Sequence, residues 1–307
     1  MNMPQQRSVH TPSTLPVSRS ALSHVLLMLW QDRLARLGLF MLVLIVALAL
    51  LAPWIAPQNP YDLSQLMIMD NRLPPGSSGM SGVTYWLGSD DQGRDLLSAI
   101  LYGTRTSLVV GVSSALVALC IGMVAGLLSA WLGGKTDALL MRIVDIQLSF
   151  PPILIALILL AVLGQGVDKI ILALVITQWA YYARTLRASA LLENRRNYVD
   201  AARGMAFSTP RILFRHVLPN CLPPLIVVAT MRIAYAIMLE ATLSFLGIGL
   251  PITEPSLGLL IANGFDYLLS GDYWISLFPG VMLLLLIVAI NLIGDALRDA
   301  LNTRQEE

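Results

Sequence analysis

Few residues of this 307-residue chain have the types and spacing that chemistry requires. Residues 129–136, SAWLGGKT, come close to a phosphate-binding loop, but Ser129 stands where the first glycine is needed and an apolar helix precedes it. We interpret this segment as a helix end. The histidines, His10, His24 and His216, lie at no ligand spacing from Cys or Glu and suggest no nucleophile triad. We therefore predict no catalytic residue and no metal site.

Asp90, Asp91 and Asp95 form an acidic group that needs an explanation. They do not complete the ligand spacing of a calcium loop. We interpret them as solvated surface charge, with one residue capping the helix that starts near Asp95.

Arg232 and Glu240 interrupt an otherwise apolar stretch, residues 221–249. A charge deep in a membrane helix normally faces the bundle interior or a water-filled cavity. The two lie about 80° apart around a helix, so both side chains can lie on the same side of that helix. For Arg232 we favour a water-filled cavity over structural pairing, and for Glu240 we favour structural pairing; both are kept as candidates to line a path through the membrane. Arg142 and Asp145, three residues apart, are expected to pair with each other.

Composition places most of the chain in lipid. Hydrophobic residues make up 56% and charged residues 13%, about half the share of a soluble protein. The mean hydropathy is +0.70. With 20 basic and 19 acidic residues the net charge is +1, which excludes a broad polyanion-binding surface and hence a nucleic-acid partner. Cys120 and Cys221 lie in or beside apolar stretches and suggest no disulfide framework.

Gaps between charged residues indicate the membrane spans. Four stretches lack charge and supply the roughly 20 apolar residues that a bilayer requires: 37–61, 106–134, 146–167 and 273–294. Two less regular spans are expected near 170–183 and 221–249. The prediction is an all-α membrane protein with six transmembrane helices. The first is an uncleaved signal anchor, and residues 1–20 are expected to be a disordered tail.

The basic residues orient these helices. Seven arginines lie between the fourth helix and the fifth, whereas residues 250–273 contain no Lys or Arg. Because positive residues stay in the cytoplasm, both termini are predicted to be cytoplasmic. The predicted parts are a cytoplasmic tail 1–32, a first helix 33–56, an extracytoplasmic segment 57–105, a transmembrane domain 106–297 containing a cytoplasmic loop 190–219, and a tail 298–307.

The cytoplasmic loop, residues 190–219, is too polar to span and too patterned to be a flexible linker. NYVDAARGMAF predicts one short helix. Ser208 is expected to cap a second, RILFRHVL, with Pro210 in its first turn and its end before Leu218. Small residues in the first helix allow another surface to approach closely: Ala201, Ala202, Gly204 and Ala206. A basic anchor on lipid headgroups is the alternative, and the residues alone leave both open.

The same loop resembles the cytoplasmic loop of ABC importer permeases, whose pattern is Glu-Ala-Ala, three residues, Gly, nine residues, Ile, one residue, Leu-Pro. Asp200, Ala201 and Ala202 match the first three positions, and Leu218 and Pro219 match the last two. This chain departs from the pattern in three ways: Asp200 replaces Glu, Ala206 stands at the Gly position with Gly204 two residues early, and His216 replaces Ile. The resemblance implies that this loop couples the chain to an ATPase subunit.

Other segments resemble the dipeptide/oligopeptide/nickel branch of those permeases. They include residues 87–108 (LGSDDQGRDLLSAILYGTRTSL), residues 239–258, and matches between Gly134 and Pro151. Separately, Gly122 and Gly126 form a small-xxx-small pattern, which favours close helix contact.

The resemblance implies a type I ABC importer permease fold and a function. The chain would be a permease subunit forming half of the translocation path for di- or oligopeptides or a related solute, in the bacterial inner membrane. It would work by alternating access with a second, paralogous permease, an extracytoplasmic solute-binding protein and two ATPase subunits that hold ATP and Mg. No cofactor is expected on this chain, and it is not expected to be an enzyme.

The alternative is a self-sufficient secondary transporter, which would need an ion-coupling carboxylate at mid-membrane and usually internal repeats. No repeat is evident, and the central charge, Arg232, is basic. A membrane-embedded enzyme ranks third, because no catalytic constellation is visible.

Overall fold

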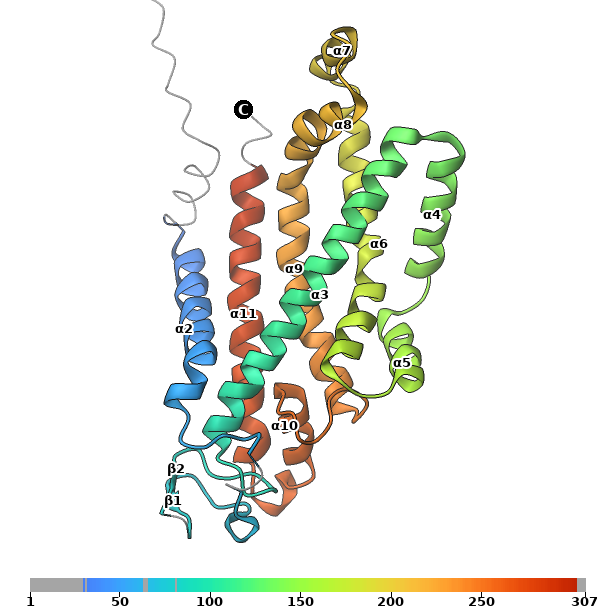
Figure 1. Cartoon of the computed structure of the whole chain (residues 1–307). Coiled ribbons are helices and arrows are strands. Elements are labelled where there is room, and N and C mark those ends of the chain that lie inside the picture. The colour runs from blue at the N-terminus through green and yellow to red at the C-terminus, as the bar shows by residue number, and fades with distance from the viewer. Residues whose placement is uncertain (1–29, 31, 63–65, 81, 303–307) are drawn as a thin grey trace, which may run out of the picture.

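Long helices lie side by side in this computed structural model, which describes residues 30, 32–62, 66–80 and 82–302 (Figure 1). The predicted disordered tail, residues 1–20, lies outside the described residues. The helices of the bundle are α2 (Arg33–Ile55), α3 (Leu96–Leu132), α4 (Gly134–Leu148), α5 (Pro152–Leu163), α6 (Val167–Glu193), α9 (Leu218–Phe245) and α11 (Trp274–Asn302).

Shorter elements occupy the two ends of the bundle (Figure 1). At one end lie α7 (Asn197–Gly204), α8 (Thr209–Ile212) and a π-helical turn, η3 (Leu213–Val217). At the other end lie η2 (Ile68–Asp70), the hairpin β1 (Ser77–Ser78) and β2 (Thr84–Tyr85), α10 (Leu257–Phe265) and η4 (Leu268–Ser270). The C-terminal end of α11 lies at the α7 end, and α2 starts on that side and runs toward the hairpin.

Four helical segments are long and apolar enough to cross a membrane: α2, α3, the continuous run Thr209–Phe245, and α11. Large apolar side chains stand exposed along them, including Phe40 at 67% and Val124 at 61%. Such surface is what lipid covers in a membrane protein, since water-exposed apolar patches of this extent are rare.

The third predicted span, 146–167, is not one straight helix: it covers the end of α4, the break after it, the short α5 and the first residue of α6. α4 and α5 meet at an angle of 87°, and counting the pair as one span gives five. The bend falls at Pro151, where the proline and its follower Pro152 disfavour helical geometry in the residue before each.

The helix α6 is 27 residues long but less apolar than the long helices α2, α3, α9 and α11. It packs closely against α3, since a Cβ atom built on Gly122 would lie 2.5 Å from Cβ of Tyr182, and one on Gly126 would lie 2.5 Å from the Ala183 carbonyl oxygen. The predicted role of these two glycines in helix contact is confirmed.

The predicted helix start near Asp95 is confirmed: α3 begins at Leu96, and Asp95 caps it by accepting hydrogen bonds from the Ser98 N–H and hydroxyl. Two other predicted helix ends differ from the structure. α11 continues to Asn302, beyond the predicted boundary at 297.

The prediction that a helix ends before Leu218 is also wrong, since the chain passes from η3 directly into α9. Pro219 has no N–H to donate back to the preceding turn, and it lies directly after the irregular turn η3. The N–H of Leu218 reaches back to the Leu213 carbonyl, which is the wider hydrogen-bond spacing of a π turn.

Candidate functional site

The predicted cytoplasmic loop, residues 190–219, projects from one end of the bundle as two short helices (Figure 1). The predicted first helix is confirmed as α7. Ser208 holds the cap position of α8, with Pro210 in the first turn, but its side chain makes no capping hydrogen bond. The loop is thus an ordered helical projection.

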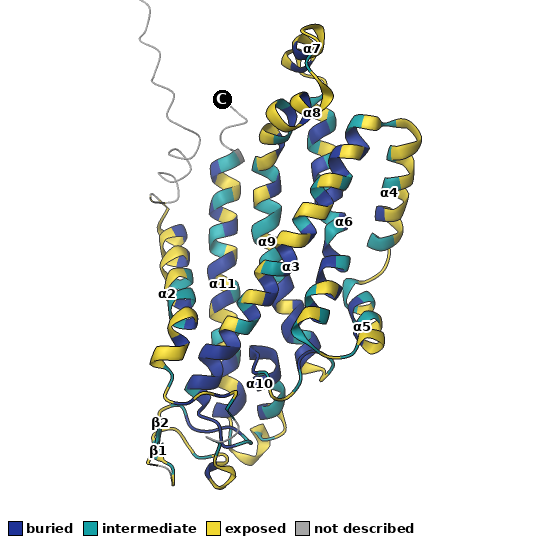
Figure 2. Ribbon diagram, viewed as in Figure 1, coloured by how far each residue is buried: buried dark blue, intermediate teal, exposed yellow. Residues whose placement is uncertain are grey.

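The helix α7 has a buried face and an exposed face. Val199 and Ala202 are buried in an apolar cluster that includes Ile212 and Val217. The other four small or acidic residues of this segment are exposed: Asp200, Ala201, Gly204 and Ala206. Figure 2 shows this exposed surface at the tip of the molecule. The exposed face can therefore accept a partner while Ala202 holds the helix from beneath.

The turn after α7 keeps the geometry that glycine normally provides. Ala206 has a φ of 56°, in the left-handed region where a side chain costs roughly 1–2 kcal/mol. The N–H of Phe207 reaches back to the Ala202 carbonyl at 3.2 Å, which is the outer hydrogen bond of a Schellman cap. Replacing Gly by Ala at this position therefore does not abolish the turn.

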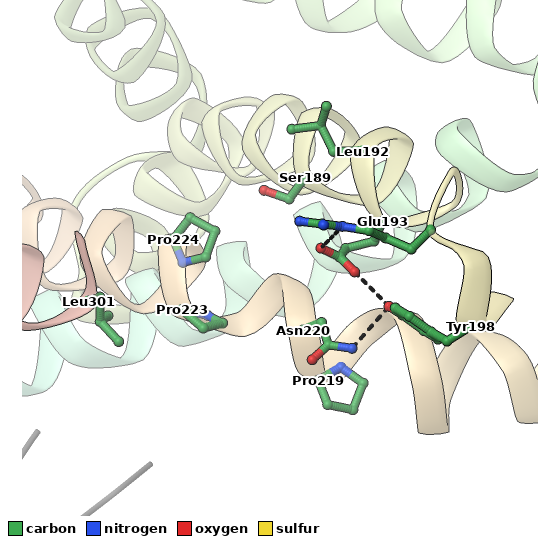
Figure 3. Close-up of a pocket in the computed structure, with 10 residues that line it drawn as sticks. Ser189, Leu192, Glu193, Tyr198, Pro219, Asn220, Pro223, Pro224 and Leu301 are labelled. Atoms are coloured by element: carbon green, nitrogen blue, oxygen red, sulfur yellow. Dashed lines mark hydrogen bonds and ion pairs between the residues drawn. The ribbon is translucent and has the colours of Figure 1, made fainter. Parts of the chain in front are cut away.

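Tyr198 joins α7 to the ends of two long helices (Figure 3). Its hydroxyl donates to Oε2 of Glu193 at 2.6 Å and accepts from Nδ2 of Asn220 at 3.0 Å. Burial and the hydrogen bond to Glu193 raise the pKa of Tyr198 to about 12, so the hydroxyl keeps its proton at neutral pH. We call Glu193, Tyr198 and Asn220 the Tyr198 junction.

Sequence analysis missed the Tyr198 junction. Its members are separated by 5 and 22 positions, and no spacing rule connects them. The junction borders a cavity of about 730 Å³ formed by the ends of α6, α9 and α11, with Ser189, Pro223 and Leu301 in its wall (Figure 3).

Arg232 lies half-buried between α6 and α9. The carbon of its guanidinium group is 3.5 Å from the centre of the Tyr181 ring and 5.4 Å from that of Tyr235. Aromatic faces attract a cation, most strongly where water is scarce, so the two rings hold the charge in place. The sequence pattern did not reveal Tyr181, because it comes from a different helix.

Glu240 is fully buried and serves to join helices. Ser107 of α3 donates to its Oε2 at 2.9 Å, and Ser244 donates to its Oε1 at 2.8 Å. Buried carboxylates are tolerated where hydrogen bonds replace water. The geometry favours structural pairing for Glu240, and its partners differ from those of Arg232.

The acidic group in the outer segment is not solvated as predicted. Asp90 and Asp95 are fully buried, and Asp91 is half-buried. Asp90 accepts from Nε of Arg94 at 2.6 Å and from the Arg94 N–H at 2.9 Å, while Asp95 caps α3. These partners offset part of the cost of removing the carboxylates from water. Within the described ranges, no group of three or more His, Cys, Asp or Glu is placed to hold a metal ion.

The predicted pair of Arg142 and Asp145 is wrong. Asp145 instead forms an ion pair with Arg184 of α6. Asp137 of α4 accepts hydrogen bonds from Nε and Nη2 of Arg187, at 2.5 and 2.6 Å. Two of the arginines that orient the chain thus also tie α6 to α4. Tertiary packing, which local spacing does not reveal, brings these partners together.

Comparisons with known proteins agree on one family. Residues 118–307 match the binding-protein-dependent transport system inner membrane component, and residues 20–75 match the N-terminal transmembrane domain of oligopeptide transport permease C. A putative peptide transport system permease protein of Brucella abortus is 43% identical over 276 residues, which is 90% of each chain. The di/tripeptide transport system permease protein DppC of Pseudomonas aeruginosa is 39% identical over 87% of each chain.

A solved structure shows the same fold. The MetNI methionine ABC transporter, in an inward-facing conformation, contains a chain that superimposes with a TM-score of 0.54 at 22% identity. The match covers 66% of this chain and 96% of that chain.

Proposed function

Because this chain belongs to the family of binding-protein-dependent transport system inner membrane components, we propose that it forms half of the translocation path of an ATP-driven importer of di- or oligopeptides. The observation that carries this proposal is the exposed face of α7 at the tip of the bundle, on residues that match the permease loop pattern. The names of the relatives supply the class of cargo.

Six membrane crossings with both termini in the cytoplasm form part of the proposal. The four or five apolar spans support it, and α6 adds the sixth because its 27 residues pack beside α3. At 1.5 Å per residue, such a helix is long enough to span the roughly 30 Å core of a bilayer. The setting is a bacterial inner membrane.

We assign the parts of the chain accordingly. The domain 106–297 builds the path, the loop 190–219 contacts the ATPase, the segment 57–105 lies outside, and the tails 1–32 and 298–307 lie in the cytoplasm. In the loop, Asp200, Ala201, Gly204 and Ala206 face the partner, while Ala202, Leu218 and Pro219 support them.

The partners follow from this division of labour. Two ATPase subunits bind ATP and Mg and carry out hydrolysis, a second, paralogous permease completes the path, and a solute-binding protein delivers cargo from outside. This chain then needs no cofactor of its own. Alternating access moves the cargo, and Arg232 presents a positive charge to it. A secondary transporter would instead use a free carboxylate for ion coupling, whereas both oxygens of Glu240 accept hydrogen bonds from serines.

The test is purification and reconstitution. The chain is expressed with the transport genes that neighbour it, purified through a tag in mild detergent, and placed in proteoliposomes with the binding protein. ATPase subunits are expected to co-purify, and uptake of labelled Ala-Ala is expected to require ATP. Uptake by this chain alone, driven by an ion gradient without ATP, would overturn the proposal.

A further inference from the structure

The helix α7 is held to the rest of the chain in two different ways. On one side Val199 and Ala202 pack into the apolar cluster beneath it. On the other side the Tyr198 junction borders the cavity of about 730 Å³, so hydrogen bonds take the place of packing there.

The junction contacts each helix that must move with α7. Glu193 is the last residue of α6, and Asn220 lies in the first turn of α9. One hydroxyl therefore connects three elements (Figure 3). The bond to Glu193 is charge-assisted, which makes it stronger than a hydrogen bond between neutral groups.

The junction also secures the irregular turn that precedes α9. Nδ2 of Asn220 donates to the His216 carbonyl at 2.8 Å, and that carbonyl lies 3.3 Å from the Tyr198 hydroxyl. His216 is part of the π turn η3, and π turns inside helices often mark functional sites. The turn lies between α8 and α9, where a movement of the loop enters the membrane helix.

We propose that Tyr198 is a positioning residue for coupling, whose hydroxyl transmits displacement of α7 to both α6 and α9. This inference rests on the proposed function, because it takes α7 as the contact with the ATPase. If Tyr198 only held the loop in place, its removal would not change the number of peptides transported per ATP hydrolysed. The two roles therefore differ in the ratio of ATP hydrolysed to peptide transported.

The test uses the whole importer in proteoliposomes with its binding protein, ATP and labelled Ala-Ala. Tyr198→Phe removes only the hydroxyl. It is expected to keep complex yield and ATPase activity within about twofold of wild type and to raise the ATP used per peptide about tenfold, the factor that corresponds to the lower end of the range for a hydrogen bond to a charged group. Tyr273→Phe, which alters an exposed tyrosine at the opposite end of the molecule, is the matched control and should leave the ratio unchanged.

Further variants keep the inference testable if Tyr198→Phe assembles poorly. Asn220→Asp removes the donor and should raise the ratio, whereas Glu193→Gln keeps an acceptor and should stay closer to wild type than Glu193→Leu. In the double variant Tyr198→Phe with Asn220→Asp the effects should be less than additive, because both remove the same link.

Two results would overturn the inference. One is an unchanged ratio in assembled Tyr198→Phe; the other is a loss of complex in every junction variant, Asn220→Asp included, which marks a purely structural role. If the wild-type importer itself takes up no peptide, the proposed function fails and the inference falls with it. An intact wild type with an unchanged variant ratio refutes the Tyr198 role alone.

Discussion

Two neighbouring alanines of α7 offer a way to separate docking from folding. Ala201 is exposed, whereas Ala202 is 1% exposed and packs in the apolar cluster. We expect Ala201→Arg to insert and fold normally but to lose ATPase subunits and transport, because a bulky charge blocks the docking face. Ala202→Arg should instead lower the yield of folded chain, since burying an unpaired charge in packed surroundings costs several kcal/mol.

Membrane yield, monodispersity and co-purified ATPase distinguish these outcomes. Asp200→Arg serves as a second exposed variant and should behave like Ala201→Arg. Normal transport by both exposed variants would show that α7 is not the docking surface. The structure thus separates Ala202 from Ala201, Gly204 and Ala206, the small residues with which the sequence pattern groups it.

Arg232 provides a test of the translocation path. We expect Arg232→Met to assemble normally but to slow uptake of Ala-Ala relative to Ala-Ala amide, because a guanidinium can receive a peptide carboxylate and the amide has none. Arg232→Lys retains the charge and is the matched control. Tyr181→Leu should shift the preference in the same direction, because it removes the ring that lies 3.5 Å from the guanidinium carbon.

Uptake rates for the two cargoes, with complex yield measured on the same preparations, distinguish a role of Arg232 in the translocation path from a structural role. Loss of the complex in Arg232→Met would show that Arg232 stabilises the packing of α6 against α9. Equal yield and an unchanged cargo preference would place Arg232 outside the path.

Among the elements, the sequence predicts some features well and misses others for a physical reason. Gaps between charges locate α2, α3 and α11, since a membrane span must be apolar. α6 and the bent pair of α4 and α5 are harder, because burial against other helices allows polar residues and the prolines interrupt the span.

Side-chain partners are the least predictable part of the candidate site. The pairing of Arg184 with Asp145 and the Tyr198 junction depend on which helices lie side by side, and no local spacing encodes that. Asp90 and Arg94 are the exception, since their four-residue separation already allowed a pair; only their burial required the structure.

The contact between α3 and α6 leads to a prediction about stability. We expect Gly122→Ala to lower the free energy of unfolding by about 1–3 kcal/mol, the usual cost of overpacking. Its new Cβ would meet Cβ of Tyr182 at 2.5 Å and the Trp179 carbonyl oxygen at 2.6 Å, and backbone atoms cannot easily give way. Gly280→Ala in α11 is the control, because its Cβ would meet no atom within 4 Å. Thermal unfolding in detergent measures both, and equal stability of the two variants would contradict the close packing.

At the scale of the whole molecule, the two ends of the bundle differ in character. The arginine-rich loop and the end of α11 lie at one end, and the hairpin of β1 and β2 lies with α10 at the other (Figure 1). Because positive residues remain in the cytoplasm, the first end is expected to be inside. An ATPase could reach α7 only in this orientation.

Cysteine labelling tests that orientation directly. In a background with Cys120→Ser and Cys221→Ala, Ser78→Cys places an exposed thiol on β1 and Gly204→Cys places one at the end of α7, where a Cβ meets no atom within 4 Å. In right-side-out vesicles we expect an impermeant maleimide to label Ser78→Cys at once and Gly204→Cys only after detergent is added. Each variant is the other's control, since both thiols are accessible and differ only in the end of the bundle they mark. The reverse pattern would put α7 outside, where there is no ATPase to meet it, and would remove the physical basis for coupling through the loop.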